Sequence, residues 1–431
     1  MTDKKNITLK FKGLWFLPSD PENKIGGLLV FDSHKNITLE LFGYFNGCEE
    51  IDLLDAFTKP NQPLKIIHGI TIDNKVISLI NCYESKNINY VNAVNLTTYD
   101  CKYLLEGTHL LSAEQLYFNT ITLNAPILPI WKQPGILQNT FYFDEDGKTK
   151  KVQVSADRDS YWEKTFDIGG GYQLQLNSFG NFSSNYEKTE YLHTQTTELS
   201  IHSYNHKRTL FELLNKLLLA SKFITLATSS TFTLDNIILY SNCTSDEGSS
   251  PNPIKLFYKQ SKEKIQKIDY TNFLFRYDDI SDIFPEVILK WYEESSRLSP
   301  IRNHLIESIK PKSYFSSLDF LTIVQSLEGY HTRFINKKRT LSERLKELYI
   351  YFDNVDIITN SPVNITIIVI NRNYYSHFYD KDEKILEGQE LYDLTKKLRV
   401  LLTCCTLSVI GFQNSKINDL LNKRNSYKQL F

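Results

Sequence analysis

The spacing of hydrophobic positions divides the chain into a strand-rich first part and a helix-rich second part. Before about residue 128, short apolar segments are separated by turn residues, and residues 38–42 alternate strictly between apolar and polar. Residues 65–72 and 76–80 are separated by a segment containing Asp73-Asn74, which predicts a β-hairpin. We therefore expect a β-rich N-terminal part.

Beyond a loop rich in Ser, Asp and Pro at residues 244–253, apolar positions recur every three or four residues. This spacing predicts amphipathic helices. It is carried by Phe284, Val287, Ile288, Trp291 and Tyr292, by Leu318, Leu321, Val324, Leu327, His331 and Phe334, by Leu341, Leu345, Leu348 and Phe352, and by Leu391, Leu394, Leu398, Leu401, Cys405 and Val409. The switch of period predicts an α+β protein, with a β-rich domain over residues 1–250 and an all-helical domain over residues 255–431.

Capping residues mark the ends of several of these helices. Thr209 with Glu212, and Thr340 with Glu343, have the spacing of a capping box, in which each side chain bonds the other's backbone N–H. The first predicts a helix to about Ala227, and Gly411 is the expected residue just after the last long helix.

Residues 361–378 hold the candidate chemistry, and two opposed signals bear on their structure. Ser361 followed by Pro362 is typical of an N-cap and first helical position. The β-branched run from Ile365 to Ile370 favours a strand by propensity alone. We interpret the segment as a helix that reaches His377.

Three residues of this helix are candidates for catalysis: Arg372, Asn373 and His377. Asn373 lies one turn before His377 and is expected to orient its imidazole, while Arg372 is expected to pair with Ser376. Arg372 and His377 lie about 140° apart on a helical wheel, so they do not share one narrow face. A groove between two such helices would receive both side chains, which suggests a symmetric dimer.

Length and composition place limits on the function. The chain has 431 residues, which favours two domains, and its net charge of −1 gives no overall attraction to nucleic acid. Six cysteines show no Cys-x-x-Cys pair, so neither a zinc site nor a redox motif is indicated, and no cofactor is expected. No apolar segment is long enough to cross a bilayer, so we expect a cytoplasmic protein with no membrane partner.

The motif resembles the signature of the HEPN superfamily, Arg-Asn-x-x-x-His, and its flanks resemble the ApeA-like branch. The sequence Arg-Asn-Tyr-Tyr-Ser-His-Phe at residues 372–378 is followed by an amphipathic helix that ends at Gly411-Phe412. Residues 13–18, 26–28 and 39–43 resemble the start of the ApeA N-terminal domain. The resemblance therefore reaches both ends of the chain.

The resemblance also implies roles for residues around the motif. Glu328 matches an acid common at this position of ApeA-like helices, where it would orient Arg372 or His377; a solvated helix residue is the alternative. Tyr375 and Ser376 belong to the motif, and a tyrosine here would either stack on a base or pack in the core. Lys337, Lys338 and Arg339 are candidate phosphate contacts, with solvated loop residues as the alternative.

The chemistry that suits Arg372 and His377 is metal-independent endonucleolytic cleavage of RNA. His377 would move a proton and Arg372 would stabilise the charge on phosphate, with a 2′,3′-cyclic phosphate as product. The resemblance implies anti-phage defence of the abortive-infection type, with a toxic RNase acting as a homodimer through its HEPN domain. It also implies an N-terminal sensor or restraint, a phage-derived trigger, and an RNA substrate for which tRNA is one candidate. A non-catalytic HEPN adaptor that binds nucleotides or proteins is the alternative.

Overall fold

The computed structural model describes residues 8–45, 64–88, 93–110, 116–133, 137–156, 162–187, 189–204, 206–241, 252–260, 268–311, 315–380 and 384–423. The chain forms two compact units that are interleaved in sequence. The first contains residues 1–125, 198–217 and 233–262, and the second contains residues 126–197, 218–232 and 263–431. Each unit is described by itself.

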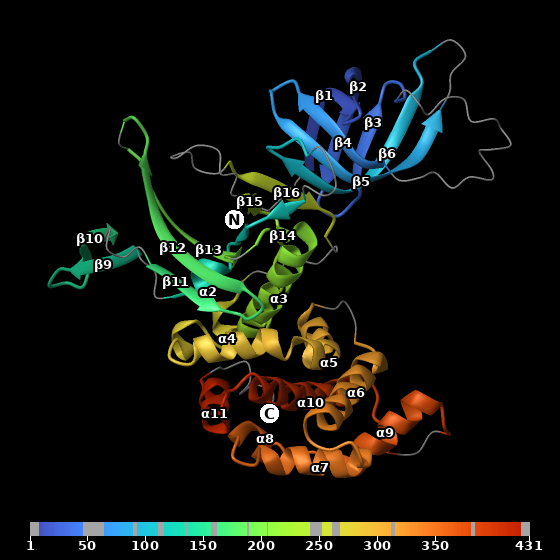
Figure 1. The fold of residues 1–431 in the computed structure, drawn as a ribbon. Coiled ribbons are helices and arrows are strands. Elements are labelled where there is room, and N and C mark those ends of the chain that lie inside the picture. The colour runs from blue at the N-terminus through green and yellow to red at the C-terminus, as the bar shows by residue number, and fades with distance from the viewer. Residues whose placement is uncertain are drawn as a thin grey trace. The chain divides into compact units, whose positions relative to one another are not determined.

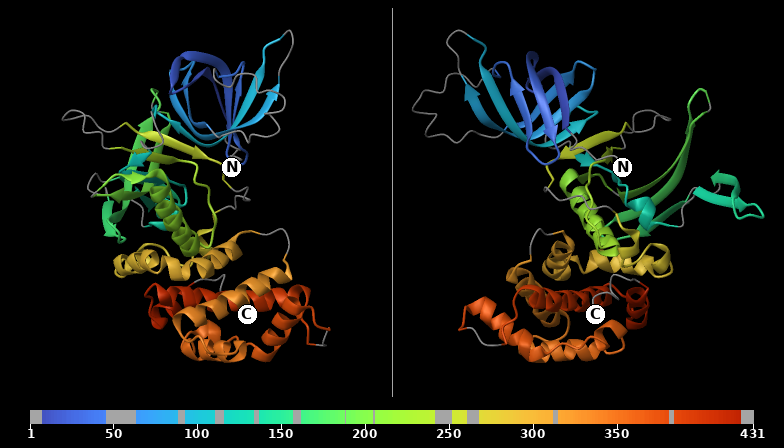
Figure 2. Two further views of the ribbon diagram at one scale, coloured as in Figure 1. Left: turned by 45° about the vertical axis from the view of Figure 1, so that its right-hand side comes forward. Right: turned by 180° about the vertical axis from the view of Figure 1, so that it is seen from behind.

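Strands of the first unit close into an antiparallel ring (Figure 1). Around the ring, β1 pairs with β2, β2 with β3, β3 with β6, β6 with β5, β5 with β4, and β4 with β1 again. The ring consists of β1 (Thr8–Leu17), β2 (Asp20–Asp32), β3 (Ile37–Leu41), β4 (Leu64–Thr71), β5 (Val76–Ile88) and β6 (Leu96–Glu106). Figure 2 shows this barrel from two further directions.

The predicted hairpin is confirmed as β4 and β5. The two strands pair from Ile70 opposite Val76, and the Thr71 N–H donates to the Lys75 carbonyl across the turn. Asn74 has a φ of 61°, a left-handed conformation that asparagine tolerates better than most residues. The local turn chemistry therefore sets the register of this part of the barrel.

The barrel interior is filled around Trp15, whose side chain is fully buried. Its neighbours include Leu29, Leu39 and Leu79 from other strands of the ring. Trp15 faces Gly69 across the β1–β4 pair, and a Cβ atom placed on Gly69 would lie 2.3 Å from the indole ring. The missing side chain at Gly69 is thus what makes room for the tryptophan.

Further short elements complete the first unit, and two elements, β13 and α3, are divided between the first unit and the second. The list is β7 (Tyr117–Phe118), β8 (Thr120–Asn124), β14 (Arg208–Thr209), β15 (Ile237–Tyr240) and β16 (Ile254–Tyr258), with parts of β13 (Tyr191–Ser203) and α3 (Leu210–Thr228). Thr209 and Glu212 form the predicted reciprocal bonds at the start of α3.

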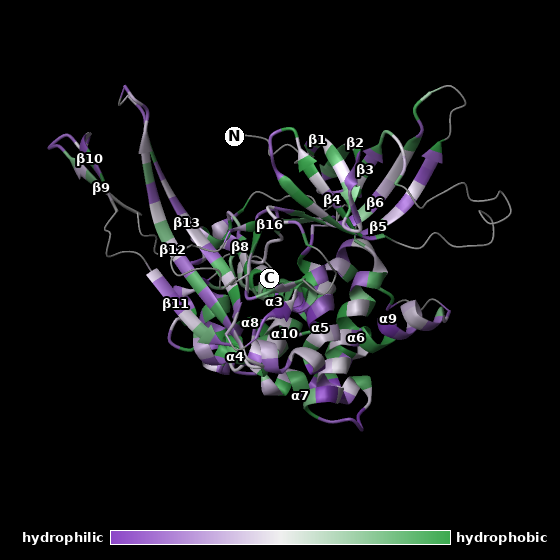
Figure 3. Cartoon of the chain, turned by 45° about the horizontal axis from the view of Figure 1, so that its top comes forward, coloured by the Kyte–Doolittle hydropathy of each residue, from purple (hydrophilic) through white to green (hydrophobic). Residues whose placement is uncertain are grey.

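The second unit combines a few strands with the helices of the C-terminal part. Its strands show alternating hydrophobic and hydrophilic bands in Figure 3, most clearly along β12. The elements are α2 (Leu128–Trp131), β9 (Leu137–Phe143), β10 (Thr149–Ala156), β11 (Trp162–Asp167), β12 (Tyr172–Ser184), α4 (Phe284–Glu293), α5 (Ser295–Ile309), α6 (Ser317–Phe334), α7 (Leu341–Tyr351), α8 (Asp356–Thr359), α9 (Ile365–His377), α10 (Gly388–Val409) and α11 (Asn414–Asn422).

An aromatic cluster packs α3 against α4 in this second unit. The Phe223 ring lies 5.4 Å from the Trp291 ring and 5.9 Å from the Phe284 ring. The Trp291 indole N–H donates to the Leu219 carbonyl at 2.9 Å, so the buried indole is satisfied by helix backbone. Beyond α4, the buried face of α10 contacts α5, α6, α8 and α11 and forms the centre of the helical bundle.

The expected α+β class, with a β-rich N-terminal part and a helical C-terminal part, is confirmed. Of the loop at residues 244–253, residues 244–251 lie outside the described residues. The predicted domain boundary between residues 250 and 255 therefore stays a prediction.

Replacing Gly69 by alanine tests the packing of the barrel. We expect Gly69→Ala to lower the free energy of unfolding by about 1–3 kcal/mol, because the new methyl group collides with the Trp15 ring. Gly26→Ala is the matched control, since its Cβ would meet only Phe42 at an ordinary 3.7 Å. Urea unfolding followed by tryptophan fluorescence measures both variants. Equal unfolding midpoints for them would contradict this account of Gly69.

Candidate functional site

Helix α9 carries the Arg372, Asn373 and His377 motif, and it starts later than the sequence suggested. Asn364, not Ser361, is its N-cap: the Asn364 side-chain oxygen accepts from the Thr366 and Ile367 N–H groups at 3.0 and 3.4 Å. Asparagine is among the best N-cap residues, and its bonds satisfy two amides that the helix leaves free. The expected helix through His377 is confirmed despite the β-branched run.

A buried amide fixes the last turns of α9. The Asn371 side chain is fully buried, and its Nδ2 donates to the carbonyls of Ile367 (2.8 Å) and Lys384 (3.1 Å). Its Oδ1 accepts from the Leu386 N–H at 2.8 Å. The Tyr375 hydroxyl donates to the Leu386 carbonyl at 2.7 Å. These bonds hold the motif helix to the segment that leads into α10.

Arg372 and His377 are in contact within one chain. Arg372 Nη1 lies 3.3 Å from His377 Nε2 and 3.2 Å from Asn373 Oδ1. The angle of about 140° between the two residues on a helical wheel therefore does not predict the distance between their side chains. The long arginine side chain reaches along the helix to its last turn. Asn373 accordingly bonds Arg372 rather than His377, in contrast to our expectation.

Glu328 on α6 supports the guanidinium. Its Oε2 lies 3.5 Å from Arg372 Nη2, and both side chains are about one-third exposed or less. The pairing joins α6 to α9 and places a negative charge beside the arginine. Ser376, expected to pair with Arg372, is exposed and is not among the described partners of Arg372.

The geometry defines how the pair can act on a proton. A guanidinium has only donors, so its contact with His377 Nε2 requires a lone pair on that nitrogen. That places the proton of a neutral imidazole on Nδ1, an assignment from hydrogen-bond geometry. His377 is exposed at the end of the helix, so a substrate can approach its imidazole from the solvent.

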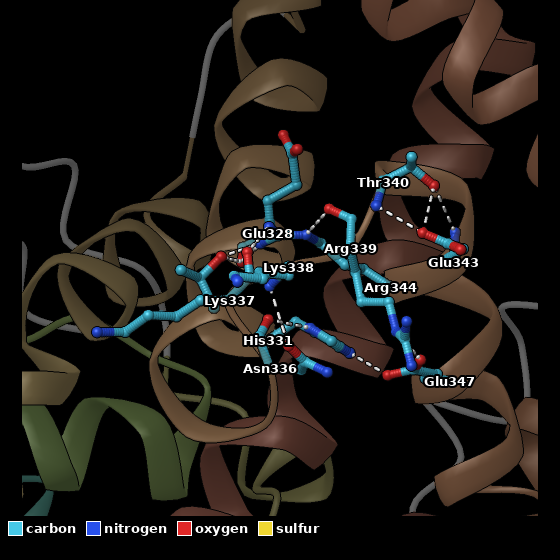
Figure 4. Close-up of polar contacts among 11 residues, drawn as sticks. Glu328, His331, Asn336, Lys337, Lys338, Arg339, Thr340, Glu343, Arg344 and Glu347 are labelled. Atoms are coloured by element: carbon cyan, nitrogen blue, oxygen red, sulfur yellow. Dashed lines mark hydrogen bonds and ion pairs between the residues drawn. The ribbon is translucent and has the colours of Figure 1, made fainter.

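The residues proposed to bind phosphate lie on the turn between α6 and α7 (Figure 4). Lys337 and Lys338 are exposed, while Arg339 Nε lies 2.7 Å from Glu347 Oε1. Arg339 is therefore paired with a carboxylate within the chain, whereas no described carboxylate pairs with either lysine. Of the three candidates, the two lysines are the better placed to bind an anion.

Arg344 on α7 organises this turn. Its nitrogens donate to the carbonyls of Glu328 (2.9 Å), Lys337 (3.1 Å) and Arg339 (2.9 Å), and it also contacts the Thr332 hydroxyl. One guanidinium thus ties the turn to the point of α6 from which Glu328 reaches Arg372. The expected capping box of Thr340 and Glu343 starts α7 beside it (Figure 4).

Buried His331, near the end of α6, also contacts this turn. Its Nε2 lies 2.7 Å from Glu347 Oε2 and its Nδ1 lies 3.1 Å from the Asn336 carbonyl. The His331 hydrogen bond is the main reason that the pKa of the Glu347 carboxyl is lowered.

Sequence reasoning missed Asn371 and Arg344. Asn371 directly precedes the motif, but its burial depends on the path of residues 384–386 and leaves no local signal. Arg344 follows the capping box of α7 and resembles any solvated helix arginine in the sequence. Both residues position the candidate site through contacts with segments distant in the sequence.

The described residues contain neither a cluster of metal ligands nor a helix suited to cross a membrane. Among them, no group of three or more His, Cys, Asp or Glu side chains is placed to hold a metal ion. None of their helices combines the length and the apolar character that crossing a membrane requires.

Two family models match the chain. The model described as ApeA N-terminal domain 1 matches residues 10–291, and the model described as Apea-like HEPN matches residues 321–416. The chain belongs to the ApeA-like HEPN family. Searches of curated proteins and of solved structures found no significant match.

Membership of the ApeA-like HEPN family implies a HEPN protein of anti-phage defence, and HEPN domains are generally RNases. The HEPN match begins within α6 and ends within α11, so it contains Glu328, the α6–α7 turn and the whole of α9. The N-terminal match continues through residue 291, into α4.

Replacing Asn371 by aspartate tests the buried clamp. The carboxylate has nearly the same shape but cannot donate to the Ile367 and Lys384 carbonyls, so we expect a loss of about 2–3 kcal/mol of stability. Asn373→Asp, two residues along the same helix and half-buried, is the matched control and should change stability by about 0.5 kcal/mol or less. Thermal unfolding at neutral pH compares them. An Asn371→Asp protein as stable as its control would remove the argument for the clamp.

Proposed function

We propose that this chain is a metal-independent endoribonuclease in which Arg372 and His377 carry the chemistry. The observation that supports this most directly is the contact of Arg372 Nη1 with His377 Nε2 at 3.3 Å, on an exposed helix end. A proton acceptor and a permanent positive charge lie side by side there. Together they can serve both needs of RNA cleavage without a metal ion.

In the proposed reaction, the ribose 2′-oxygen attacks the adjacent phosphorus and the bond to the 5′-oxygen breaks. When the Arg372 guanidinium turns from His377 Nε2 to the phosphate, the freed Nε2 lone pair takes the proton from the 2′-hydroxyl. The departing 5′-oxygen receives a proton from a second acid. Arg372 stabilises the negative charge that develops on the non-bridging oxygens. The products are a 2′,3′-cyclic phosphate and a 5′-hydroxyl. Glu328 acts as a positioning residue, because it holds Arg372 and does not reach the substrate in this account.

Lys337 and Lys338 are proposed to bind phosphates of the same RNA. The Lys337 and Glu328 carbonyls share the guanidinium of Arg344, so the turn and the origin of the Glu328 side chain are joined through one residue. A strand held at the turn would pass close to the part of α6 that supports Arg372. The N-terminal domain remains a proposed sensor or restraint that answers to a phage-derived trigger.

Homodimerisation through α9 is proposed from the surface of this helix. Although its first half is almost entirely apolar, only Ile368 and Asn371 of α9 are buried in the single chain. Ile370 and His377 are seven residues apart, so they lie within about 20° of each other on the helix. A second copy packed on this face would cover the apolar side chains. It would also bring a second His377, which can supply the acid that protonates the leaving oxygen.

Substitution of the motif tests the proposed cleavage. We expect Arg372→Ala and His377→Ala each to lower RNA cleavage by about 100-fold or more, with little change in thermal unfolding. His206→Ala, which removes another exposed histidine, is the control and should cleave normally. Sequencing of RNA ends after expression in cells, and assays with purified protein in EDTA, provide the measurements. Full activity of His377→Ala, or loss of wild-type activity in EDTA, would refute the proposal and favour the non-catalytic adaptor.

A charged residue on α9 tests the proposed dimer. We expect Ile370→Lys to shift the protein towards monomer and to reduce cleavage, because the lysine would have to be buried between the two helices. Ile350→Lys is the matched control, since Ile350 on α7 is also an apolar surface residue, 69% exposed. Light scattering with and without RNA measures the assembly. A wild-type protein that stays monomeric at working concentration and cleaves at full rate is incompatible with the dimer.

A further inference from the structure

A pocket lies in the helical unit between the end of α5, the start of α6 and the first half of α10. Its volume is about 390 Å³, which is within the range of about 300–1,000 Å³ typical of small-molecule sites. The residues that give it its chemistry are Lys310, Phe315, Asp319, Tyr392, Lys396 and Arg399.

Positive charge predominates in this pocket. Lys310 and Lys396 each pair at 2.9 Å with an acid three residues before them, Glu307 and Asp393. These acids are 58% and 46% exposed, so the pairs are weak and leave both lysines able to bind an anion. Among the described residues that line the pocket, Asp319 is the one carboxylate, and it accepts from the Ser316 N–H in the capping box of α6.

Arg399 is held in place at the wall of the pocket. Its Nη1 donates at 2.9 Å to the Ser308 carbonyl, one of the carbonyls that the end of α5 leaves without a helical partner. Within the described part of the chain, Arg399 forms no ion pair. A guanidinium fixed by one nitrogen, with other N–H groups remaining, is suited to bind a phosphate at two points.

An aromatic surface stands beside these cations. The Phe315 and Tyr392 rings meet edge to face with centroids 5.3 Å apart, and Lys396 Nζ lies 4.7 Å from the centre of the Tyr392 ring. Tyr392 is 38% exposed, which leaves part of its ring free to contact a ligand. A planar heteroaromatic base stacks on such a surface, whereas inorganic phosphate has no aromatic ring and gains nothing from it.

This pocket is separate from the Arg372 and His377 site. Ile323, which lines the pocket, is five residues before Glu328, so the two residues point about 140° apart around α6. The pocket therefore lies on a different face of α6 from the one that supports Arg372.

We propose that this pocket binds a nucleoside 5′-phosphate, either as a free nucleotide or as the phosphorylated 5′ end of an RNA. The base stacks at Tyr392 and Phe315, and the phosphate is bound by Arg399 with Lys310 and Lys396. The proposal does not depend on RNA cleavage, because it concerns binding at residues outside the motif.

Direct binding measured by calorimetry on the full chain tests this site. The probes are the four nucleoside 5′-monophosphates, the matching nucleosides, ribose 5-phosphate, and a short RNA with and without a 5′-phosphate. The Arg372→Ala protein is used for the RNA arms, so that cleavage does not interfere. We expect the monophosphates to bind, and the nucleosides and ribose 5-phosphate not to bind. The 5′-phosphorylated RNA should bind more tightly than the same RNA without its 5′-phosphate, because only a terminal phosphate enters this pocket. Binding of free monophosphates identifies a nucleotide as the ligand, and binding of the 5′-phosphorylated RNA alone identifies an RNA end.

Variants then locate the binding. Arg399→Gln and Lys310→Gln should each weaken it about tenfold or more, since a charge-assisted hydrogen bond is lost. Lys310→Gln keeps the inference testable if Arg399→Gln fails to fold, because the ion pair of Lys310 with the exposed Glu307 contributes little to stability. Lys346→Gln, an exposed lysine of α7, is the charge-matched control and should bind normally. Binding of ribose 5-phosphate as tightly as nucleotide, absence of binding by every probe, or unchanged binding in Lys310→Gln would overturn the proposal.

Discussion

The candidate site depends on one buried amide. Asn371 is enclosed in the helical bundle, where an unsatisfied amide would cost about 1–3 kcal/mol, so its donors and acceptor must find partners. The partners are backbone groups of α9 itself and of the segment before α10. Since Arg372 follows immediately and His377 lies within the next two turns, the same amide determines where both side chains emerge. The two motif side chains at the surface are therefore positioned by a residue that is itself buried.

Local signals in the sequence were sufficient for several elements. The β4–β5 hairpin and the capping boxes at Thr209 and Thr340 depend on residues a few positions apart, and all three are present as predicted. The closure of the barrel could not be predicted in this way, because β3 pairs with β6 across some sixty residues, as Thr38 opposite Asp100 shows. Such pairings follow from the whole set of strands and not from any one of them.

The motif itself was found from its residues, but its geometry was not. A helical wheel places Cα atoms and ignores the length of a side chain, so it kept Arg372 away from a histidine that it contacts. The predicted start of α9 was three residues too early for a similar reason. Ser361 and Asn364 are both good N-cap residues, and only the backbone conformation distinguishes them. Glu328 was expected from family resemblance to act near the motif, and it lies beside Arg372. Its catalytic relevance stays a prediction, as do the roles of Arg372 and His377.

The closed ring of β1 to β6 limits how the barrel can recognise another molecule. A strand at the edge of an open sheet offers a row of free N–H and C=O groups, to which an extended peptide can add itself. Each of the six described strands of the ring has a neighbour on both sides, so the ring offers little free strand edge to which a peptide could add. A barrel of this kind can recognise another molecule only through its side chains and connecting loops. Because the outward side chains and loops can mutate without breaking the strand pairs of the ring, the same barrel could acquire a new binding specificity.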